Sequence, residues 1–265
     1  MKLCSLASGS SGNCIYIGSD TTHLLVDTGI SGKRTEGGLN QIDLTLSDID
    51  GILITHEHSD HIGSLGVISR KCKVPIYGTK ETLNAILKTN SLGDINKELL
   101  IEISPDHKFT IKDICVNPMH VSHDAADPVA YRFSYGNKKI GIITDLGCFD
   151  DYTVDSLQGL DAILIEANHD VNMLQVGPYP YYLKQRILGK RGHLSNEVSG
   201  HLISRLLHDN MQKIILGHLS KENNMAELAY ETVRLEVTAA DIPYNGNDFP
   251  IIVAKRSENT EAIII

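Results

Sequence analysis

Short apolar runs separated by glycine and polar residues recur along the whole chain. Each run holds four to eight residues. Runs of this length, bounded by turn residues, are typical of strands and too short for most helices. We therefore expect strands at residues 3–7, 14–17, 23–26, 49–54, 75–78, 99–103, 109–116, 129–135, 139–143, 162–165, 213–216 and 251–254.

Apolar residues spaced three or four positions apart alternate with these strands and predict amphipathic helices. The first expected helix starts near Asp60 and His61 and carries Ile62, Leu65 and Ile68; the second covers residues 79–88, with Leu83, Ile86 and Leu87 turned inward. The third is capped by Ser195 or Asn196 and carries Val198, Leu202 and Leu206, and the fourth covers residues 225–237. Residues 31–48 are glycine-rich and polar, and we expect a loop there with at most a short helix.

The order of these elements indicates the fold class. Strands alternate with helices but also pair in hairpins, such as the one expected across Gly136 and Asn137. This combination indicates an α/β protein with mixed sheets covered by helices, rather than one parallel sheet. Because no short repeat or low-complexity linker interrupts the 265 residues, we expect a single domain over residues 1–265.

Composition narrows the class of protein. Hydrophobic residues make up 42% of the chain and charged residues 22%, which is typical of a globular protein. No apolar run reaches the roughly 18 residues of a membrane span, and the N-terminal residues lack the apolar core of a signal peptide. The five cysteines form no C-x-x-C pair, so we expect reduced thiols, a cytoplasmic location and no thiolate zinc site. Cys148, three residues past Asp145, could line the site, but we expect it to be a core thiol.

Charge argues against one class of partner surface. Lys and Arg number 24 and Asp and Glu number 33, so the formal net charge is 24 − 33 = −9. This balance excludes a protein coated in positive charge for nucleic acid, although a local basic track remains compatible with it.

The densest candidate chemistry lies in residues 55–61, directly after the predicted strand at 49–54. In an extended segment, residues two apart point the same way, so His56 and His58 can reach one cation together. Asp60 and His61 follow where the chain turns, and they can reach a second cation. Because imidazole nitrogen and carboxylate oxygen suit zinc, manganese or iron, the H-x-H-x-D-H spacing predicts a two-metal site. The alternative interpretation is a solvated, histidine-rich turn.

Further ligands are expected where other strands end, since strand ends converge at one rim of a sheet. Either His120 or His123 offers one more nitrogen, Asp145 suits a bridge between two metals, and His218 offers another nitrogen. Asp27, at the end of the predicted strand at 23–26, is a candidate for holding a ligand in position. Each of these residues taken singly is more often a surface or capping residue.

These motifs resemble the metallo-β-lactamase fold superfamily, in the order of that family and over nearly the whole chain. Five segments more narrowly resemble the bacterial YycJ/WalJ (VicX) family: Ser8-Gly9-Ser10-Ser11-Gly12-Asn13, Thr55-His56-Glu57-His58-Ser59-Asp60-His61, Ser122-His123-Asp124-Ala125, Gly192-His193-Leu194-Ser195-Asn196 and Gly217-His218-Leu219-Ser220-Lys221-Glu222-Asn223-Asn224. That family is regarded as metal-dependent DNA exonucleases that act 5′ to 3′ on duplex DNA.

The resemblance implies a four-layer αβ/βα sandwich with two metal ions at one edge between two sheets. It assigns one metal to His56, His58 and His123, the other to Asp60, His61 and His218, and both to Asp145 as the bridge. It prefers His123 over His120, and it makes Asp27 a supporting residue rather than a ligand.

A pair of divalent cations can hold a hydroxide between them, lower its pKa and neutralise charge on a phosphoryl oxygen. Asp60 would then both bind a metal and orient the hydroxide. Thioester, lactam and phosphodiester hydrolysis all use such a site, so the fold does not choose among them.

Phosphodiester cleavage expels an alkoxide, which benefits from a proton donor. His193 in a glycine-flanked loop suits this role, with Glu166 at the end of the strand at 162–165 to orient it, and the pair resembles the relay of ribonuclease Z-type nucleases. His169 is the second choice. The alternative interpretations are an exposed loop histidine for His193 and a helix-capping acid for Glu166.

Candidate contacts to a nucleic acid, with DNA preferred, lie in three places. Basic residues beside aromatic ones suit a phosphate track with base contacts, although a solvated helix face would also explain them. The glycine- and serine-rich loop could present backbone N–H groups to an anion, or it could be a plain hairpin turn. The candidates are Lys184, Arg186, Lys190 and Arg191 next to Tyr179, Tyr181 and Tyr182; Lys221; and Ser10, Ser11 and Asn13.

Two other functions remain open at the level of sequence. A thioesterase of the glyoxalase II type or a lactonase would use the same metals without His193 or the basic stretch. A regulatory protein that keeps a metal for stability would need no catalysis. A flavodiiron-type oxidoreductase is disfavoured, because those sites resemble H-x-E-x-D whereas His58 occupies the middle position here.

Overall fold

The structure is a computed structural model that describes residues 1–265, and the chain divides into two compact units. The first unit contains both termini and consists of Met1–His120, Ala125–Asn137 and Lys255–Ile265. The second unit consists of Val121–Asp124 and Lys138–Ala254. Each unit is therefore built from segments that are distant in sequence.

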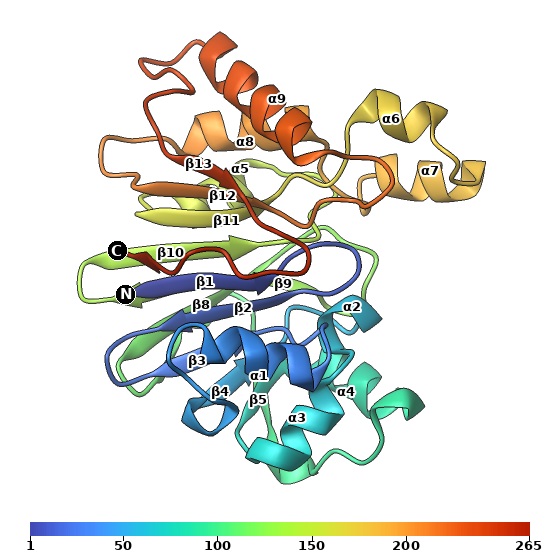
Figure 1. Cartoon of the computed structure of the whole chain (residues 1–265), viewed down its shortest axis with the longest axis vertical. Coiled ribbons are helices and arrows are strands. Elements are labelled where there is room, and N and C mark those ends of the chain that lie inside the picture. Colours follow the sequence, from blue (N-terminus) through green and yellow to red (C-terminus); the bar gives the residue numbers. More distant parts are fainter. The chain divides into compact units, whose positions relative to one another are not determined.

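The strands form two mixed sheets flanked by helices, which confirms the predicted α/β sandwich class (Figure 1). One sheet lies in the first unit, in the order β14-β1-β2-β3-β4-β5-β6. Its strands are β1 (Lys2–Ala7), β2 (Cys14–Gly18), β3 (His23–Val26), β4 (Gly51–Leu53), β5 (Ile76–Thr79), β6 (Leu100–Ile103) and β14 (Ile263–Ile264). Neighbours from β14 to β3 are antiparallel and those from β3 to β6 are parallel.

The other sheet has the order β13-β12-β11-β10-β9-β8-β7. Antiparallel strands β7 (Phe109–Ile111), β8 (Ile114–His120) and β9 (Val129–Tyr135) belong to the first unit. Parallel strands β10 (Lys138–Ile143), β11 (Ala162–Glu166), β12 (Lys213–Gly217) and β13 (Ile251–Val253) belong to the second. Every residue of β11 is buried, which explains why this strand is a continuous apolar run rather than an alternating one.

Helices of the first unit pack on its sheet through a core that includes Leu25, Ile52, Leu65 and Ile68. Figure 1 shows α1, α3 and α4 gathered beside β3, β4 and β5. The helical segments are α1 (Gly32–Asn40), η1 (Leu46–Asp48), α2 (Ser59–Ile62), α3 (Leu65–Cys72), α4 (Lys80–Leu87), η2 (Asn90–Leu92) and η3 (Lys97–Leu99).

The second unit carries five helices, of which two pack closely on each other. They are α5 (Asp151–Leu157), α6 (Val171–Val176), α7 (Tyr181–Leu188), α8 (Asn196–Leu206) and α9 (Ala226–Ala239). Gly200 of α8 lets α9 approach, because a Cβ there would lie 2.5 Å from the Cβ of Glu236. In Figure 1, α6 and α7 lie apart from the α8–α9 pair. No helix of the protein combines the length and apolarity that crossing a bilayer requires.

Most predicted elements are present, and three predictions are wrong for identifiable reasons. Residues 31–48 were expected to be a loop with at most a short helix, but most of them are helical, in the nine-residue helix α1 and in η1. The Ser31 side chain caps α1, and only Thr35, Gly38 and Leu39 of this helix are buried, so it lacks the apolar spacing that predicts a helix. The expected helix through residues 62–68 is two helices, because Ser64 N–H donates to Thr28 O and leaves the helical bond unmade.

The third wrong prediction is one strand at 109–116, which is a hairpin of β7 and β8. Lys112 adopts a left-handed φ of 48°, and the Asp113 carboxylate accepts hydrogen bonds from the hydroxyls of Ser19, Thr21 and Thr22. These bonds lower the pKa of Asp113 to about 2. At the level of side chains, Leu87 was expected inside but is 40% exposed.

The helix capped by Ser195 is confirmed, since its side chain accepts from Val198 N–H. Helix α4 and helix α9 also lie at the predicted places, within two residues at each end. Strand β14 and helices α5, α6 and α7 had no predicted counterpart.

Candidate metal centre

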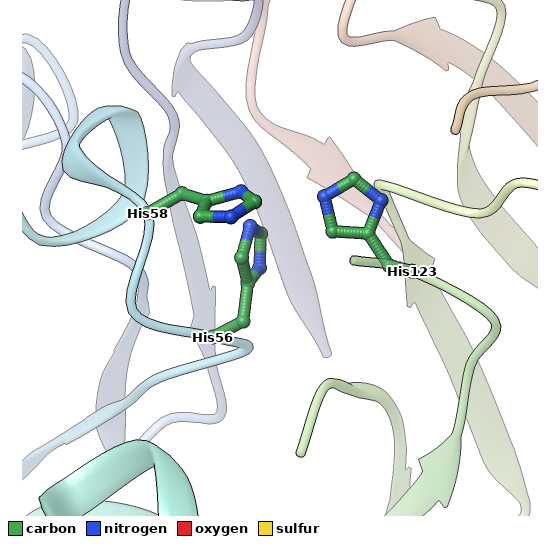
Figure 2. Close-up of side chains that lie close together, drawn as sticks. All are labelled: His56, His58 and His123. Atoms are coloured by element: carbon green, nitrogen blue, oxygen red, sulfur yellow. The ribbon is translucent and has the colours of Figure 1, made fainter. Parts of the chain in front are cut away.

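Three histidines and an aspartate gather where the chain leaves β4 in the first unit. The His56 ring centroid lies 4.6 Å from that of His58 and 4.1 Å from that of His61. Figure 2 shows the first two rings side by side on the segment after the strand; His123 in the same figure belongs to the second unit. His58 is the residue before α2, and Asp60 and His61 lie in the first turn of that helix, as predicted.

Asp27 and Thr55 hold this cluster from behind. Asp27 Oδ1 accepts from Thr55 N–H at 2.9 Å, and its Oδ2 lies 2.8 Å from Thr55 Oγ1 and 2.7 Å from His61 Nδ1. Thr55 Oγ1 also lies 3.0 Å from His56 Nδ1. When the Nδ1 of a histidine is held in this way, its Nε2 is the atom oriented for a metal. The role of Thr55 was not predicted from the sequence, although its position directly before His56 could have indicated it.

The glycine- and serine-rich loop closes on its own asparagine. Asn13 is fully buried, and its Oδ1 accepts from Gly9 N–H at 3.0 Å. Its backbone N–H donates to Asp60 O at 2.8 Å, and its Nδ2 lies 3.2 Å from His61 Nε2. Asn13 therefore fixes the start of α2, whereas Ser10 and Ser11 are exposed.

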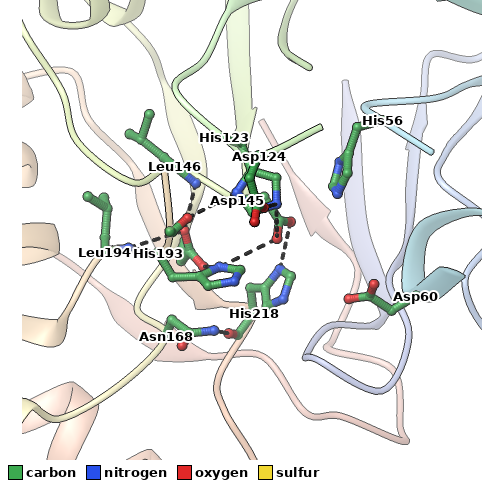
Figure 3. A network of polar contacts seen from close by, with 12 residues as sticks. His56, Asp60, His123, Asp124, Asp145, Leu146, Asn168, His193, Leu194 and His218 are labelled. Atoms are coloured by element: carbon green, nitrogen blue, oxygen red, sulfur yellow. Dashed lines mark hydrogen bonds and ion pairs between the residues drawn. The ribbon is translucent and has the colours of Figure 1, made fainter. Parts of the chain in front are cut away.

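A second cluster lies at the carboxyl edge of the parallel strands in the second unit. Asp145, Glu166, His193 and His218 each offer a ligand atom, and these atoms lie within 4.8 Å of one another. Figure 3 shows Asp145, His193 and His218 close together. Asp145 Oδ2 is 2.9 Å from His218 Nδ1, and its Oδ1 is 3.5 Å from His193 Nδ1 and 3.7 Å from His123 Nε2. Parallel order brings these residues together because the ends of β10, β11 and β12 meet at one edge.

Backbone conformation marks the same positions. Asp27, Asp145 and His218 have φ values of 62°, 56° and 54°. Non-glycine residues rarely adopt this left-handed region, and such conformations gather at functional sites, where each costs of order 1–3 kcal/mol. Asp27 and His218 directly follow the ends of β3 and β12, and Asp145 lies two residues past the end of β10, so all three lie at sheet edges.

Glu166, which is fully buried, pairs with the partly buried His193 beside Asp145. The Nδ1–H of His193 donates to Glu166 Oε1 at 2.7 Å, and Glu166 Oε2 accepts from Leu146 N–H at 2.8 Å and Leu194 N–H at 3.4 Å. Burial lowers the pKa of His193, but the charge of Glu166, their hydrogen bond and Asp145 together outweigh it and raise the pKa above 6.5. The His193 side chain keeps 12% exposure. The pair therefore combines a fixed tautomer with access.

His123 is held by the loop that carries His193. Its Nδ1 lies 3.0 Å from Gly192 O, and its carbonyl accepts from Arg191 Nε at 3.0 Å. Burial lowers its pKa, as suits a neutral ligand. His120 instead has a side chain 58% exposed and lies 3.7 Å from Asp127, outside both clusters. His169 is 1% exposed, and neither ring nitrogen has a hydrogen-bond partner.

Some of the predicted basic side chains are hydrogen-bonded to other protein groups, and others are exposed to solvent. Arg186 binds Asp124 through both Nε and Nη2, at 2.5 and 2.8 Å, and Arg191 binds the His123 carbonyl. Lys184 Nζ donates to Gln175 O at 2.7 Å. Lys190 is exposed, and the Lys221 side chain is 73% exposed. Asp124 had no sequence signal as the partner of Arg186, because 62 positions separate them.

The donor set of these clusters suits a divalent metal ion. Imidazole nitrogens and carboxylate oxygens predominate, and the five cysteines are free and absent from both clusters. Zinc and its first-row neighbours bind such donors well. Protein groups also orient His56, His61 and His123 through their Nδ1 atoms, as in known metal sites.

Comparison with known proteins gives a family match and close relatives. The family described as the metallo-beta-lactamase superfamily matches residues 7–185. The exodeoxyribonuclease YycJ of Bacillus anthracis is 44% identical over 228 residues, which cover 86% of each chain. The exodeoxyribonuclease WalJ of Streptococcus pneumoniae (strain D39) is 42% identical over 246 residues, 93% of this chain and 91% of the relative.

A solved structure supports the fold alone. The metallo-beta-lactamase fold protein YhfI from Bacillus subtilis superimposes with a TM-score of 0.71 over 98% of each chain, at 16% sequence identity.

Proposed function

The chain belongs to the metallo-beta-lactamase superfamily and, within it, to the family of the exodeoxyribonucleases YycJ and WalJ, and on that premise we propose that it is a metal-dependent exonuclease that hydrolyses phosphodiester bonds of DNA. The observation that carries the proposal is the Glu166–His193 pair, 2.7 Å apart and 3.5 Å from Asp145. A hydrolase with an activated leaving group needs no such proton donor, whereas an alkoxide leaving group benefits from one.

We infer that the two clusters together hold two divalent ions. His56, His58 and His123 would bind one ion, Asp60, His61 and His218 the other, and Asp145 both. The support is the donor chemistry, the orienting bonds to Nδ1 and the family resemblance. When bound, such a pair of ions supplies activated water and neutralises charge on the phosphoryl group. Zinc or manganese suits the set, and iron is the third choice.

His193 would act on the leaving side of the reaction. Its Nδ1–H is engaged by Glu166, so its Nε2 is the atom that can pass a proton to the departing oxygen. The buried carboxylate of Glu166 stabilises the protonated ring, and the N–H groups of Leu146 and Leu194 fix the carboxylate. Asp60 would bind metal and orient the water. Asp27 supports His61 and stays out of the ligand set.

The substrate proposal is duplex DNA degraded from the 5′ end, in the cytoplasm. Free thiols at all five cysteines are compatible with a reducing compartment. Among the proposed contacts, Lys184, Lys190 and Lys221 offer cations at the surface, and Ser10 and Ser11 are exposed. Arg186, Arg191 and Asn13 are proposed to act chiefly by holding the site, because each is bound to a neighbouring loop.

Metal analysis followed by digestion tests the proposal. We expect the purified protein to contain about two divalent ions per chain and to shorten duplex DNA labelled at one end, with digestion of the same duplex in RNA as comparison. Asp145→Asn should abolish digestion, and the exposed Tyr152→Ala serves as the matched control. Hydrolysis of a thioester or lactone panel without DNA degradation would contradict the nuclease proposal and favour the other hydrolases of this fold.

A further inference from the structure

Residues 171–196 differ in charge from the rest of the chain. They contain Lys184, Arg186, Lys190 and Arg191 but no aspartate or glutamate, in a protein of net charge −9. Such a confined cationic stretch attracts a polyanion locally, because the effect of charges fades beyond about 10 Å at ordinary salt.

Helices α6 and α7, residues 171–188, form what we call the tyrosine arm. Val176, Tyr181 and Tyr182 are 86%, 77% and 74% exposed. Only Leu174 and Ile187 of the two helices are buried. Aromatic rings usually contribute large buried areas in folded proteins, so two neighbouring tyrosines left in solvent indicate a contact surface. Figure 1 shows both helices away from the other helices of the second unit.

The tyrosine arm is joined firmly to the loop of the proposed proton donor. Lys184 Nζ donates to Gln175 O and ties α7 to the end of α6. His193 N–H donates to Ile187 O at 3.0 Å, and Arg186 holds Asp124, the neighbour of His123. A strand bound on the arm would therefore lie next to the residues that carry the chemistry, at a position set by hydrogen bonds rather than by a flexible linker.

We propose that the tyrosine arm docks unpaired nucleotides of the substrate, with Tyr181 and Tyr182 stacking on bases and Lys184 and Lys190 contacting the phosphates. This inference rests on the proposed nuclease function. Stacking on an aromatic side chain requires a base whose face is free, so the arm selects single-stranded ends or overhangs over intact duplex. A symmetric pairing of two copies through the same face would bring the two cations of each arm, with Lys190 and Arg191 next to them, close to those of the other copy, which disfavours self-association.

Kinetics on two substrates test the tyrosine arm. The variants are Tyr181→Ala/Tyr182→Ala, Tyr181→Phe/Tyr182→Phe, and Tyr152→Ala as the matched control on α5, where the tyrosine is 38% exposed. We expect the double alanine variant to raise KM for overhang DNA roughly tenfold or more, with kcat unchanged and hydrolysis of bis(p-nitrophenyl) phosphate unchanged. The double phenylalanine variant should retain wild-type KM, because it keeps the ring faces.

Three outcomes would overturn the inference. The first is an unchanged KM for overhang DNA in the double alanine variant. The second is an equal loss of activity on the small diester, which would make the arm a support for His193. The third is a dimer, seen by light scattering, that dissociates in the alanine variant without a change in KM. Fluorescence anisotropy of a labelled single-stranded oligonucleotide with metal-free protein separates this inference from the proposed function. Weaker binding by the alanine variant supports the arm even if the wild-type protein degrades no DNA.

Discussion

Individual residues at the strand ends combine unusual backbone conformation with charge. Asp27, Asp145 and His218 are left-handed, and all three are buried. Two of them lie 2.9 Å apart through their side chains. Glycine or asparagine would adopt this conformation at a lower cost in stability, so the aspartates and the histidine at these three positions point to function.

At Glu166 and His193 we predict a loss of rate without a loss of metal. His193→Gln removes the proton donor and should lower kcat about 10²- to 10⁴-fold, while Glu166→Gln, which removes the charge but keeps one acceptor oxygen, should cost less. Metal content, measured on the same preparations by elemental analysis, should match the wild type in both variants. Full loss of one metal ion in His193→Gln would instead make this histidine a ligand.

At His169 we predict a pH-dependent stability. Burial lowers the pKa of His169 to about 4, below the unfolded value of 6.5, so the native ring stays neutral while the unfolded ring takes up a proton. The stabilising effect is complete above pH 6.5 and is lost as pH falls toward 4, amounting to about 2 kcal/mol between pH 7 and pH 5.

Urea unfolding of metal-free protein at pH 7 and pH 5 measures this effect. In His169→Gln the drop in stability between the two pH values should shrink by that amount, whereas the exposed His201→Gln should behave as the wild type. An identical drop in His169→Gln and the wild type would show that another group titrates.

At the scale of elements, the loop at residues 189–193 contributes to the site chiefly by holding His123 in position, rather than through the positive charge predicted there. It holds His123 through Gly192 O and Arg191, and Ser122 Oγ donates to Lys190 O at 2.8 Å. The sequence suggested a phosphate track in this region, but the structure shows that the arginines bind protein groups first. Long-range pairing of this kind leaves no periodic pattern in a sequence.

At Gly147 we predict that a methyl group disturbs this loop. A Cβ there would lie 2.3 Å from Lys190 O and 2.5 Å from Gly192 N, so Gly147→Ala must displace the loop that carries His193. We expect a loss of about 1–3 kcal/mol in the free energy of unfolding together with a lower kcat. Gly37→Ala is the control: it lies in α1 with open space around its Cβ and should stabilise by about 0.5–1 kcal/mol. Thermal unfolding of both variants and DNA digestion compare the two.

At the scale of the whole molecule, the two units are discontinuous in sequence. The C-terminal segment Lys255–Ile265 returns to the first unit, where β14 pairs with β1 and Thr260 exchanges hydrogen bonds with Ser5. Neither unit can therefore form from one uninterrupted stretch of chain. This supports the proposal of a single domain over residues 1–265.

A single domain should unfold in one cooperative step. We predict one calorimetric transition, with a calorimetric enthalpy equal to the van't Hoff enthalpy, for protein freed of metal by a chelator. The metal-loaded protein should melt at a higher temperature, because an ion that binds only the native state stabilises it. Two separated transitions in the chelated protein would contradict the single domain.

The sequence by itself determined the fold class, most strand positions and the main ligand candidates. Buried strands need continuous apolar runs, which are visible in the sequence. The H-x-H-x-D-H spacing indicates a metal site even before the distant ligands are known. It also placed Asp27, Asp145 and His218 at strand ends, where the parallel order brings them to sheet edges.

Only the tertiary structure shows how the surroundings of similar residues differ. His120 and His123 have the same chemistry and differ by three positions, but one is exposed and the other is held by Gly192 O. In the same way, His193 meets Glu166 while His169 is buried without a partner. Burial and hydrogen bonding depend on segments far apart in the chain, and it is these contacts, rather than residue type, that set tautomer, pKa and access.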